Sequence, residues 1–316
     1  MPEPTLEPVQ RLPKARLAFI YLAPVLILAY FWAVPFVLEP RLRNVVPTPP
    51  AEELSGAQVY TQNCAYCHGV NGDGRGSVIL HPPARYFGRD KFKFATTSNA
   101  MPTDDDLKAV LNRGIPGSAM PSFAALQESQ KDAVIGHLRT LIRKGLYDRQ
   151  VQKALAEDED VEHAKFTLNA STQAVPAASL AIPKEFPAST PEAIARGKAF
   201  FTSEAWGCSK CHGPEGLGNG PQTKDPKFVN DDKTPAVPRD LTKGVFKGGA
   251  DPANIFARIR LGIPGSPMPD NKDKPEKDVF DVIAFVLSLS PTKVTVAPPA
   301  SGATLGSNSP VSGTLP

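Results

Sequence analysis

The sequence predicts a mainly helical protein, in which one N-terminal transmembrane helix precedes two small helical domains of similar sequence. Three observations support this expectation. A long apolar segment without charge lies near the N-terminus, a motif of two cysteines and a histidine occurs twice, and apolar residues recur at helical spacing near the end of each copy. A chain of 316 residues is also long enough for about two domains.

Composition narrows the class of protein. Hydrophobic residues make up 41% of the chain and charged residues 21%, which excludes a fully disordered protein and one with many membrane spans. The 34 prolines are about twice the usual share and disfavour long sheets and long unbroken helices. A net charge of +3 is too small to favour nucleic-acid binding, so no nucleic-acid partner is expected.

Residues 17–38 are predicted to form a membrane anchor, preceded by a cytoplasmic N-terminus at 1–16. The segment contains 22 consecutive residues without a charge, which in a helix suffice for about 30 Å of hydrocarbon. A cleaved signal peptide is the alternative. Its apolar region is normally only about 7 to 15 residues long, however, and a small-residue cleavage site follows it.

The rest of the chain contains an internal repeat. The segment Cys64–Gly76 matches Cys208–Gly220 at an offset of 144 residues, and Gly114–Pro121 matches Gly262–Pro269 at an offset of 148. Short helices are expected at equivalent places in both copies. They cover residues 56–60, 107–111 and 134–141 in the first copy and 197–201, 255–259 and 282–289 in the second.

The repeat divides this part of the chain into two domains, at residues 52–146 and 188–290. Residues 147–187 contain an acidic run followed by Ala-, Ser- and Pro-rich sequence, which indicates a partly helical and partly extended linker. Residues 291–316 are rich in Pro, Gly, Ser, Thr and Ala without periodicity. They are expected to form a disordered tail.

The repeated Cys-x-x-Cys-His motif is the attachment signal for c-type haem. Two thiols three positions apart can form thioethers to the haem vinyl groups, and the adjacent histidine then binds iron. A zinc site or a thioredoxin-like pair is the alternative for the cysteines alone, but the histidine and the repetition argue against both. We therefore predict two covalent haem c groups, one at Cys64 and Cys67 with ligand His68, the other at Cys208 and Cys211 with ligand His212.

The repeat also selects the second iron ligand in each domain. The first domain has two Met-Pro pairs, which begin at Met101 and Met120. The position equivalent to Met101 in the second domain is Gly249, whereas Met120 is matched by Met268 within the same Gly-Ile-Pro-Gly-Ser frame. Met120 and Met268 are therefore the predicted ligands.

Two further histidines are alternatives to the methionine of the first domain. His81 follows His68 by thirteen residues and is the one plausible competitor for the iron of this domain. His137 stands where the second copy has Phe285, and this equivalence favours a packing role for the imidazole over a ligand role.

Both copies resemble class I cytochrome c domains, and the whole chain resembles a membrane-anchored dihaem cytochrome c. The resemblance rests on the duplicated Cys-x-x-Cys-His motif and on the Gly-Ile-Pro-Gly-x-x-Met-Pro loop in each copy. It implies two mostly helical domains, each wrapped round one haem, with an N-terminal helix that crosses a C-terminal helix. Gly56, Gly197 and Phe285 match positions of this crossing, whereas His137 departs from the usual aromatic residue.

The resemblance alone makes two arginines candidates for contact with a haem propionate. The family often has an arginine near a haem propionate, and Arg85 and Arg239 stand in comparable places after prolines.

The expected function is electron transfer. Iron with His and Met ligands has a raised potential and no open coordination position, so it passes single electrons and does little chemistry on substrates. We therefore expect a non-enzymatic, membrane-anchored relay or a subunit of a respiratory or photosynthetic electron-transport complex. A dihaem peroxidase, which needs an iron that opens to peroxide, is the enzymatic alternative, and a haem-bearing sensor is a third.

The resemblance also implies a place in the cell and a class of partner. Haem attachment of this type occurs outside the bacterial cytoplasmic membrane, so a single-pass chain is expected to carry its haem domains on the periplasmic side. The expected partners are redox proteins: a membrane quinol-oxidising complex, a terminal oxidase or reductase, or a soluble cytochrome.

Overall fold

Two groups of helices with the same order along the chain make up the described part of the protein. The computed structural model describes residues 54–80, 83–89 and 91–290, which belong to one compact unit that begins at Leu54. The segments predicted at 1–16, 17–38 and 291–316 lie outside these residues, as does His81. Within the described ranges, the helices are too short or too polar to cross a membrane.

The described chain is mainly helical and contains no β-strand, only the isolated bridges Thr97–Ser179 and Val229–Pro235. The helices of the first group are α2 (Gly56–Asn63), α3 (Ala65–His68), α4 (Asp104–Arg113) and α5 (Glu128–Ala156). Those of the second group are α7 (Pro191–Thr202), α8 (Cys208–His212), α9 (Pro252–Leu261) and α10 (Glu276–Ser288). Helix α6 (His163–Gln173) lies between the groups in sequence, and the short 3₁₀ helices η1 (Pro221–Lys224) and η2 (Leu241–Lys243) precede α9.

In each group the first helix packs against the last, and a glycine sits at the point of closest approach. A Cβ atom added at Gly56 would lie 1.9 Å from the carbonyl oxygen of Ala133 in α5. A Cβ added at Gly197 would lie 1.8 Å from the carbonyl oxygen of Asp281 in α10. The expected crossing of N-terminal and C-terminal helices is therefore present in both groups.

This packing stabilises helices that are too short to be stable alone. Helix α2 has eight residues, and isolated helices below about 12 residues are marginal in water. Ser55 and Gln58 form a capping box at its start, and Val59 and Tyr60 are buried against α5. Burial of such side chains contributes about 1.5–3 kcal/mol each, and this contribution supplies the stability that the short helix lacks in isolation.

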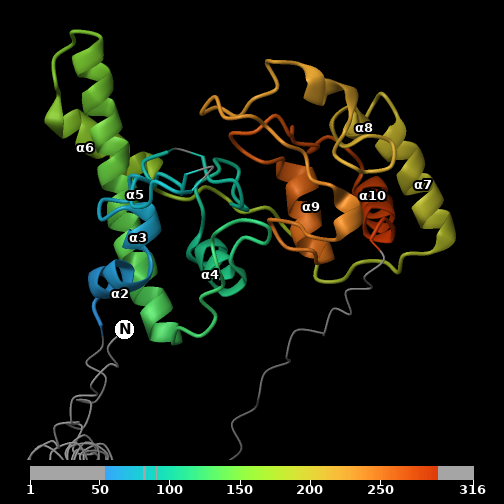
Figure 1. Cartoon of the computed structure of the whole chain (residues 1–316), viewed down its shortest axis with the longest axis horizontal. Helices are drawn as coiled ribbons and strands as arrows, with labels where there is room; N and C mark the ends of the chain where they lie inside the picture. The colour runs from blue at the N-terminus through green and yellow to red at the C-terminus, as the bar shows by residue number, and fades with distance from the viewer. Residues whose placement is uncertain (1–53, 81–82, 90, 291–316) are drawn as a thin grey trace, which may run out of the picture. The chain divides into compact units, whose positions relative to one another are not determined.

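The length of helix α5 contradicts the expectation that the high proline content disfavours long unbroken helices. It runs for 29 residues, because the chain has no proline between Pro121 and Pro176. Its last turns reach to Ala156, so the segment 147–187 begins inside this helix. Helix α6 then packs along α5, as Figure 1 shows.

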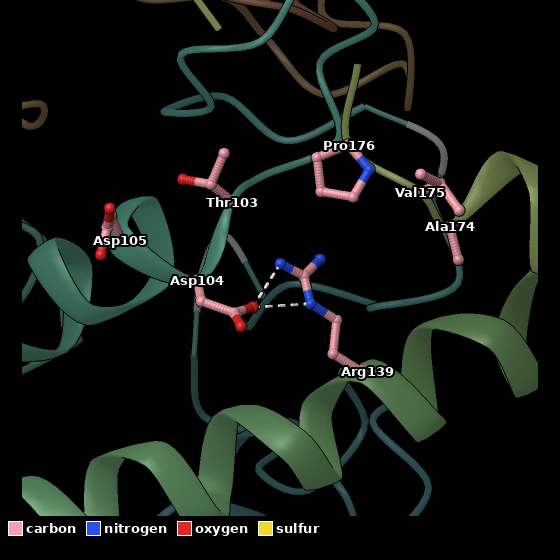
Figure 2. Close-up of a pocket in the computed structure, with 7 residues that line it drawn as sticks. All are labelled: Thr103, Asp104, Asp105, Arg139, Ala174, Val175 and Pro176. Carbon is pink, nitrogen blue, oxygen red and sulfur yellow. Dashed lines mark hydrogen bonds and ion pairs between the residues drawn. The ribbon is translucent and has the colours of Figure 1, made fainter. Parts of the chain in front are cut away.

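The chain after α6 stays in contact with the first group. Leu180 N donates to Thr96 O at 2.7 Å, and Ser98 N donates to Ala178 O at 3.1 Å. Figure 2 shows residues 174–176 beside 103–105 and Arg139, around an open pocket across which Arg139 and Asp104 form an ion pair. None of its lining residues belongs to the Cys or Met motifs.

We predict that Gly56→Ala and Gly197→Ala each lower the free energy of unfolding. The added methyl would displace the opposing helix backbone, and overpacking of this kind costs about 1–3 kcal/mol. Gly136→Ala is the matched control, because a Cβ added at this exposed glycine of α5 would have no atom within 4 Å and alanine is the better helix former. Thermal unfolding of the three variants measures the effect, and equal behaviour of all three would refute a tight crossing.

Candidate functional site

The Cys-x-x-Cys-His motif forms a short helix directly after the first crossing helix of each group. Cys64 links α2 to α3, which ends at His68, and α8 spans the whole second motif. Cys208 and Cys211 are thus one helical turn apart on α8, and Cys67 lies one turn after Cys64, the residue that precedes α3. All four cysteines are half-buried and free of disulfides, so the structure keeps both pairs available for another bond.

One ring nitrogen of each motif histidine is held by a backbone carbonyl. His68 Nδ1 donates to Arg85 O at 3.1 Å, and His212 Nδ1 donates to Arg239 O at 3.2 Å. A carbonyl can only accept, so the proton sits on Nδ1 and Nε2 keeps its lone pair. A metal-binding histidine is typically oriented in this way by its other ring nitrogen.

Burial favours the neutral forms of the motif side chains. It lowers the pKa of His68 and of His212 below the ordinary histidine value, so both imidazoles are neutral at pH 7. It also raises the pKa of the Cys64 and Cys208 thiols to about 11. Neutral imidazole is the form that binds a metal.

A glycine loop after each histidine turns the chain back under the motif helix. Gly74 N donates to His68 O, and Gly218 N donates to His212 O, both at 2.8 Å. The two glycines have φ values of +77° and +76°, and an added Cβ would lie 2.4 Å from Ala84 O or 2.6 Å from Pro238 O. Only glycine fits both the backbone angle and the close approach.

The two methionine loops have the same internal hydrogen bonds. Ile115 N donates to Met120 O at 3.1 Å, and Ile263 N donates to Met268 O at 3.2 Å. In both loops a serine hydroxyl, three residues after the isoleucine, donates to the isoleucine carbonyl at 2.7 Å. The helices before them, α4 and α9, both have ten residues and end at a glycine with φ near +66°. Met120 and Met268 are therefore equivalent in structure as well as in sequence, and both are half-buried.

The other sequence candidates lie in packing positions. The His137 ring centroid is 5.1 Å from that of Tyr60, and the Phe285 centroid is 5.1 Å from that of Phe201. His137 therefore occupies the aromatic position at the helix crossing. Met101 is 1% exposed and belongs to the core of the first group.

Sequence reasoning missed the backbone part of the site. The carbonyls of Arg85 and Arg239 hold the histidine rings from 17 and 27 residues downstream. A backbone carbonyl carries no signature in a sequence, so only the folded chain reveals these partners.

Comparisons with known proteins agree with this geometry. The family model of cytochrome c oxidase, cbb3-type, subunit III matches residues 51–138, and the family model of cytochrome c matches residues 194–290. A solved chain of the reducing HAO-like protein complex of Kuenenia stuttgartiensis is 30% identical, with a TM-score of 0.60, over 77% of this chain and 98% of that chain. No curated protein sequence matches.

The chain belongs to the cytochrome c family. It carries two cytochrome c domains in tandem, which implies binding of haem c and haem-based electron transfer. The residues present fit this cofactor. Besides the oriented histidines, the Arg239 Nε atom is buried and has no hydrogen-bond partner among the described residues, so it is a donor suited to a haem carboxylate.

We predict that each cytochrome c domain keeps its haem when the chain is denatured, because thioether bonds do not depend on the fold. Denaturing electrophoresis with haem staining, together with intact mass, is expected to show two haem groups per chain. The double variant Cys64→Ser/Cys67→Ser removes both thiols of one motif and is expected to carry one haem, as is Cys208→Ser/Cys211→Ser. A haem count that these variants leave unchanged contradicts covalent attachment at the motifs.

Proposed function

We propose that this cytochrome c is a membrane-anchored electron relay with two covalently bound haem c groups, each with one histidine and one methionine ligand. In the first domain Cys64 and Cys67 hold the haem, and His68 and Met120 are the iron ligands. In the second domain these roles fall to the residues at equivalent positions, namely Cys208, Cys211, His212 and Met268. Bound haem c supplies one-electron redox chemistry.

The observation that carries this proposal is that the histidine partners and the methionine loops of the two sites are built alike. Both have a histidine ring oriented by a backbone carbonyl, and both have a methionine loop closed by the same hydrogen bonds. A pair in which one domain performs a separate reaction would need a different ligand set at one iron. Two equal sites favour a relay over a peroxidase-type enzyme.

The residues around each proposed iron site position the ligands, and none of them is assigned a role in making or breaking the bonds of a substrate. The carbonyls of Arg85 and Arg239 orient the histidine rings, and burial keeps these rings neutral. The glycine-rich turns bring the backbone close to the motif helix. Helix crossing at Gly56 and Gly197 keeps the motif helices in place. A rigid site of this kind keeps reorganisation on oxidation and reduction small.

The proposed location is the bacterial cytoplasmic membrane, with residues 17–38 as a single span and both haem domains on the periplasmic side. The 22 uncharged residues of this segment support the anchor. Redox proteins are the proposed partners: a quinol-oxidising complex, a terminal oxidase or reductase, or a soluble cytochrome. The solved relative is part of a reducing HAO-like protein complex, which favours a fixed subunit of a larger assembly.

Native electrophoresis of mildly solubilised membranes, stained for haem, tests this last point. A fixed subunit migrates within a large assembly whose other members identify the electron path. Migration near the mass of the chain alone would instead indicate a tethered shuttle.

We predict that Met120→Ala lowers the reduction potential of one haem and Met268→Ala that of the other, because a methionine ligand raises the potential of haem iron. Each variant is also expected to lose about half of the Met–iron absorption band of the oxidised protein, since it removes one of two ligands. Redox titration and absorption spectra measure both effects. Met101→Ala is the control for the first domain, and an equal response of this variant would overturn the ligand assignment.

We predict that an alkaline wash leaves the full-length chain in the membrane pellet. The double variant Leu26→Arg/Leu28→Arg is expected to appear in the wash, because each arginine at the centre of a span costs about 2.5–3.5 kcal/mol on insertion scales. Leu26→Ile/Leu28→Ile keeps the segment apolar and serves as the control. A double arginine variant that stays in the pellet would show that another part of the chain binds the membrane.

A further inference from the structure

Arg239 forms hydrogen bonds through its backbone carbonyl and through its guanidinium, and the partners of these two groups belong to different domains. Its carbonyl accepts from His212 Nδ1 in the second cytochrome c domain at 3.2 Å. Its guanidinium Nη2 donates to Pro116 O at 3.0 Å and to Gly117 O at 3.4 Å in the first domain. Pro116 and Gly117 belong to the loop that ends at Met120, so one residue contacts the motif histidine of the second domain and the methionine loop of the first.

The guanidinium of Arg239 lies close to a glycine of the methionine loop of the first domain. Gly117 has φ of +70°, and a Cβ atom added there would lie 2.0 Å from Arg239 Nη2. The equivalent Gly265 has φ of +75°, but the nearest atom to its added Cβ is Asp231 Oδ2 at 3.8 Å. The two methionine loops share their internal hydrogen bonds and differ in this contact.

Other hydrogen bonds and ion pairs also join the two domains near Arg239. Arg258 of α9 donates from Nη1 to Lys93 O at 2.5 Å and from Nη2 to Ala95 O at 2.7 Å. Two ion pairs lie nearer to solvent, Arg89 with Asp232 at 3.2 Å and Lys91 with Asp231 at 2.9 Å. Exposed pairs of this kind contribute little to stability. Arg258 and Arg239 each donate to two backbone carbonyls of the first domain, and Lys93 Nζ donates to Asn230 Oδ1 at 3.3 Å.

We propose that Arg239 is a positioning residue shared by both redox sites, which makes the methionine ligand of the first haem depend on the second domain. Its carbonyl orients His212, and its planar, always charged guanidinium restrains the loop that carries Met120. The consequence is that a change in the second domain alters the first haem site. This inference rests on the proposed function, because it takes Met120 as an iron ligand.

The substitution Arg239→Gln tests the proposal in the full-length holoprotein. It removes the guanidinium but keeps the backbone carbonyl, so His212 retains its partner. We examine it in two backgrounds: Met268→Ala, in which the remaining Met–iron band belongs to the first haem, and Met120→Ala, in which it belongs to the second. Arg239→Gln is expected to weaken the band and lower the potential of the first haem. The band of the second haem is expected to stay in place, because Met268 and the partner of His212 are unchanged, and the loss of the Nε donor to a haem carboxylate is read from the potential of the second haem alone.

Arg258→Gln is the matched control. It also removes a guanidinium that donates to two carbonyls of the first domain, but those carbonyls belong to Lys93 and Ala95, outside both ligand loops. If Arg239 only holds the domains together, Arg258→Gln weakens the first Met–iron band as much as Arg239→Gln does, and the proposal is overturned. An unchanged band in Arg258→Gln supports it.

A second pair of variants keeps the proposal testable if Arg239→Gln does not fold. Gly117→Ala and Gly265→Ala place the same methyl group at the same backbone angle, but only the first meets Arg239. Gly117→Ala is expected to weaken the band of its own haem more than Gly265→Ala weakens that of the second haem. Equal losses would contradict a role for Arg239.

The two backgrounds separate this inference from the proposed function. If Met120→Ala and Met268→Ala do not reduce the Met–iron band, the ligand assignment fails, whatever Arg239→Gln does. If both reduce the band but Arg239→Gln leaves the first haem unchanged, the shared positioning role of Arg239 fails and the ligand assignment stands.

Discussion

The close contact between the first and last helix of each domain is the constraint on which both sites depend. At Gly56 and Gly197 a carbonyl oxygen of the opposing helix occupies the space where any other residue would carry Cβ. The Cys-x-x-Cys-His helix begins one residue after α2 ends and only a few residues after α7 ends. The crossing therefore sets where the motif helix lies relative to the core, and the local glycine turns then set the path of the chain beneath it.

Each proposed haem site combines a short helix, a downstream carbonyl and a methionine loop that are far apart in sequence. The carbonyl reaches its histidine only because the glycine-rich turn reverses the chain, with Gly74 and Gly218 at positive φ. Burial keeps each imidazole neutral, and the carbonyl holds its proton on Nδ1, so that Nε2 keeps its lone pair. The agreement between the two domains, down to the hydrogen bonds of the methionine loops, makes a shared chemical task the simplest explanation.

The asymmetry between the domains is as informative as their similarity. The Arg85 guanidinium lies 4.3 Å from the ring centroid of Phe92 in its own domain, whereas the Arg239 guanidinium donates to the methionine loop of the other domain. Two domains with equal folds thus meet through unequal surfaces. Such a contact allows one redox site to respond to the other, which two independent domains on a flexible linker would not do.

The amino-acid sequence by itself determined the duplicated motif, the eight attachment and ligand candidates and the helices that flank them, because each depends on residue type and local spacing. The resemblance to class I cytochrome c domains implied the helix crossing, at positions that Gly56 and Gly197 match. The sequence did not predict the 29-residue α5, since overall proline content says nothing about where prolines are missing. Only the tertiary structure decided which carbonyls orient His68 and His212, and which arginine reaches across the domains. Backbone carbonyls are chemically alike in every residue, and a long side chain has no preferred partner until folding brings one within reach.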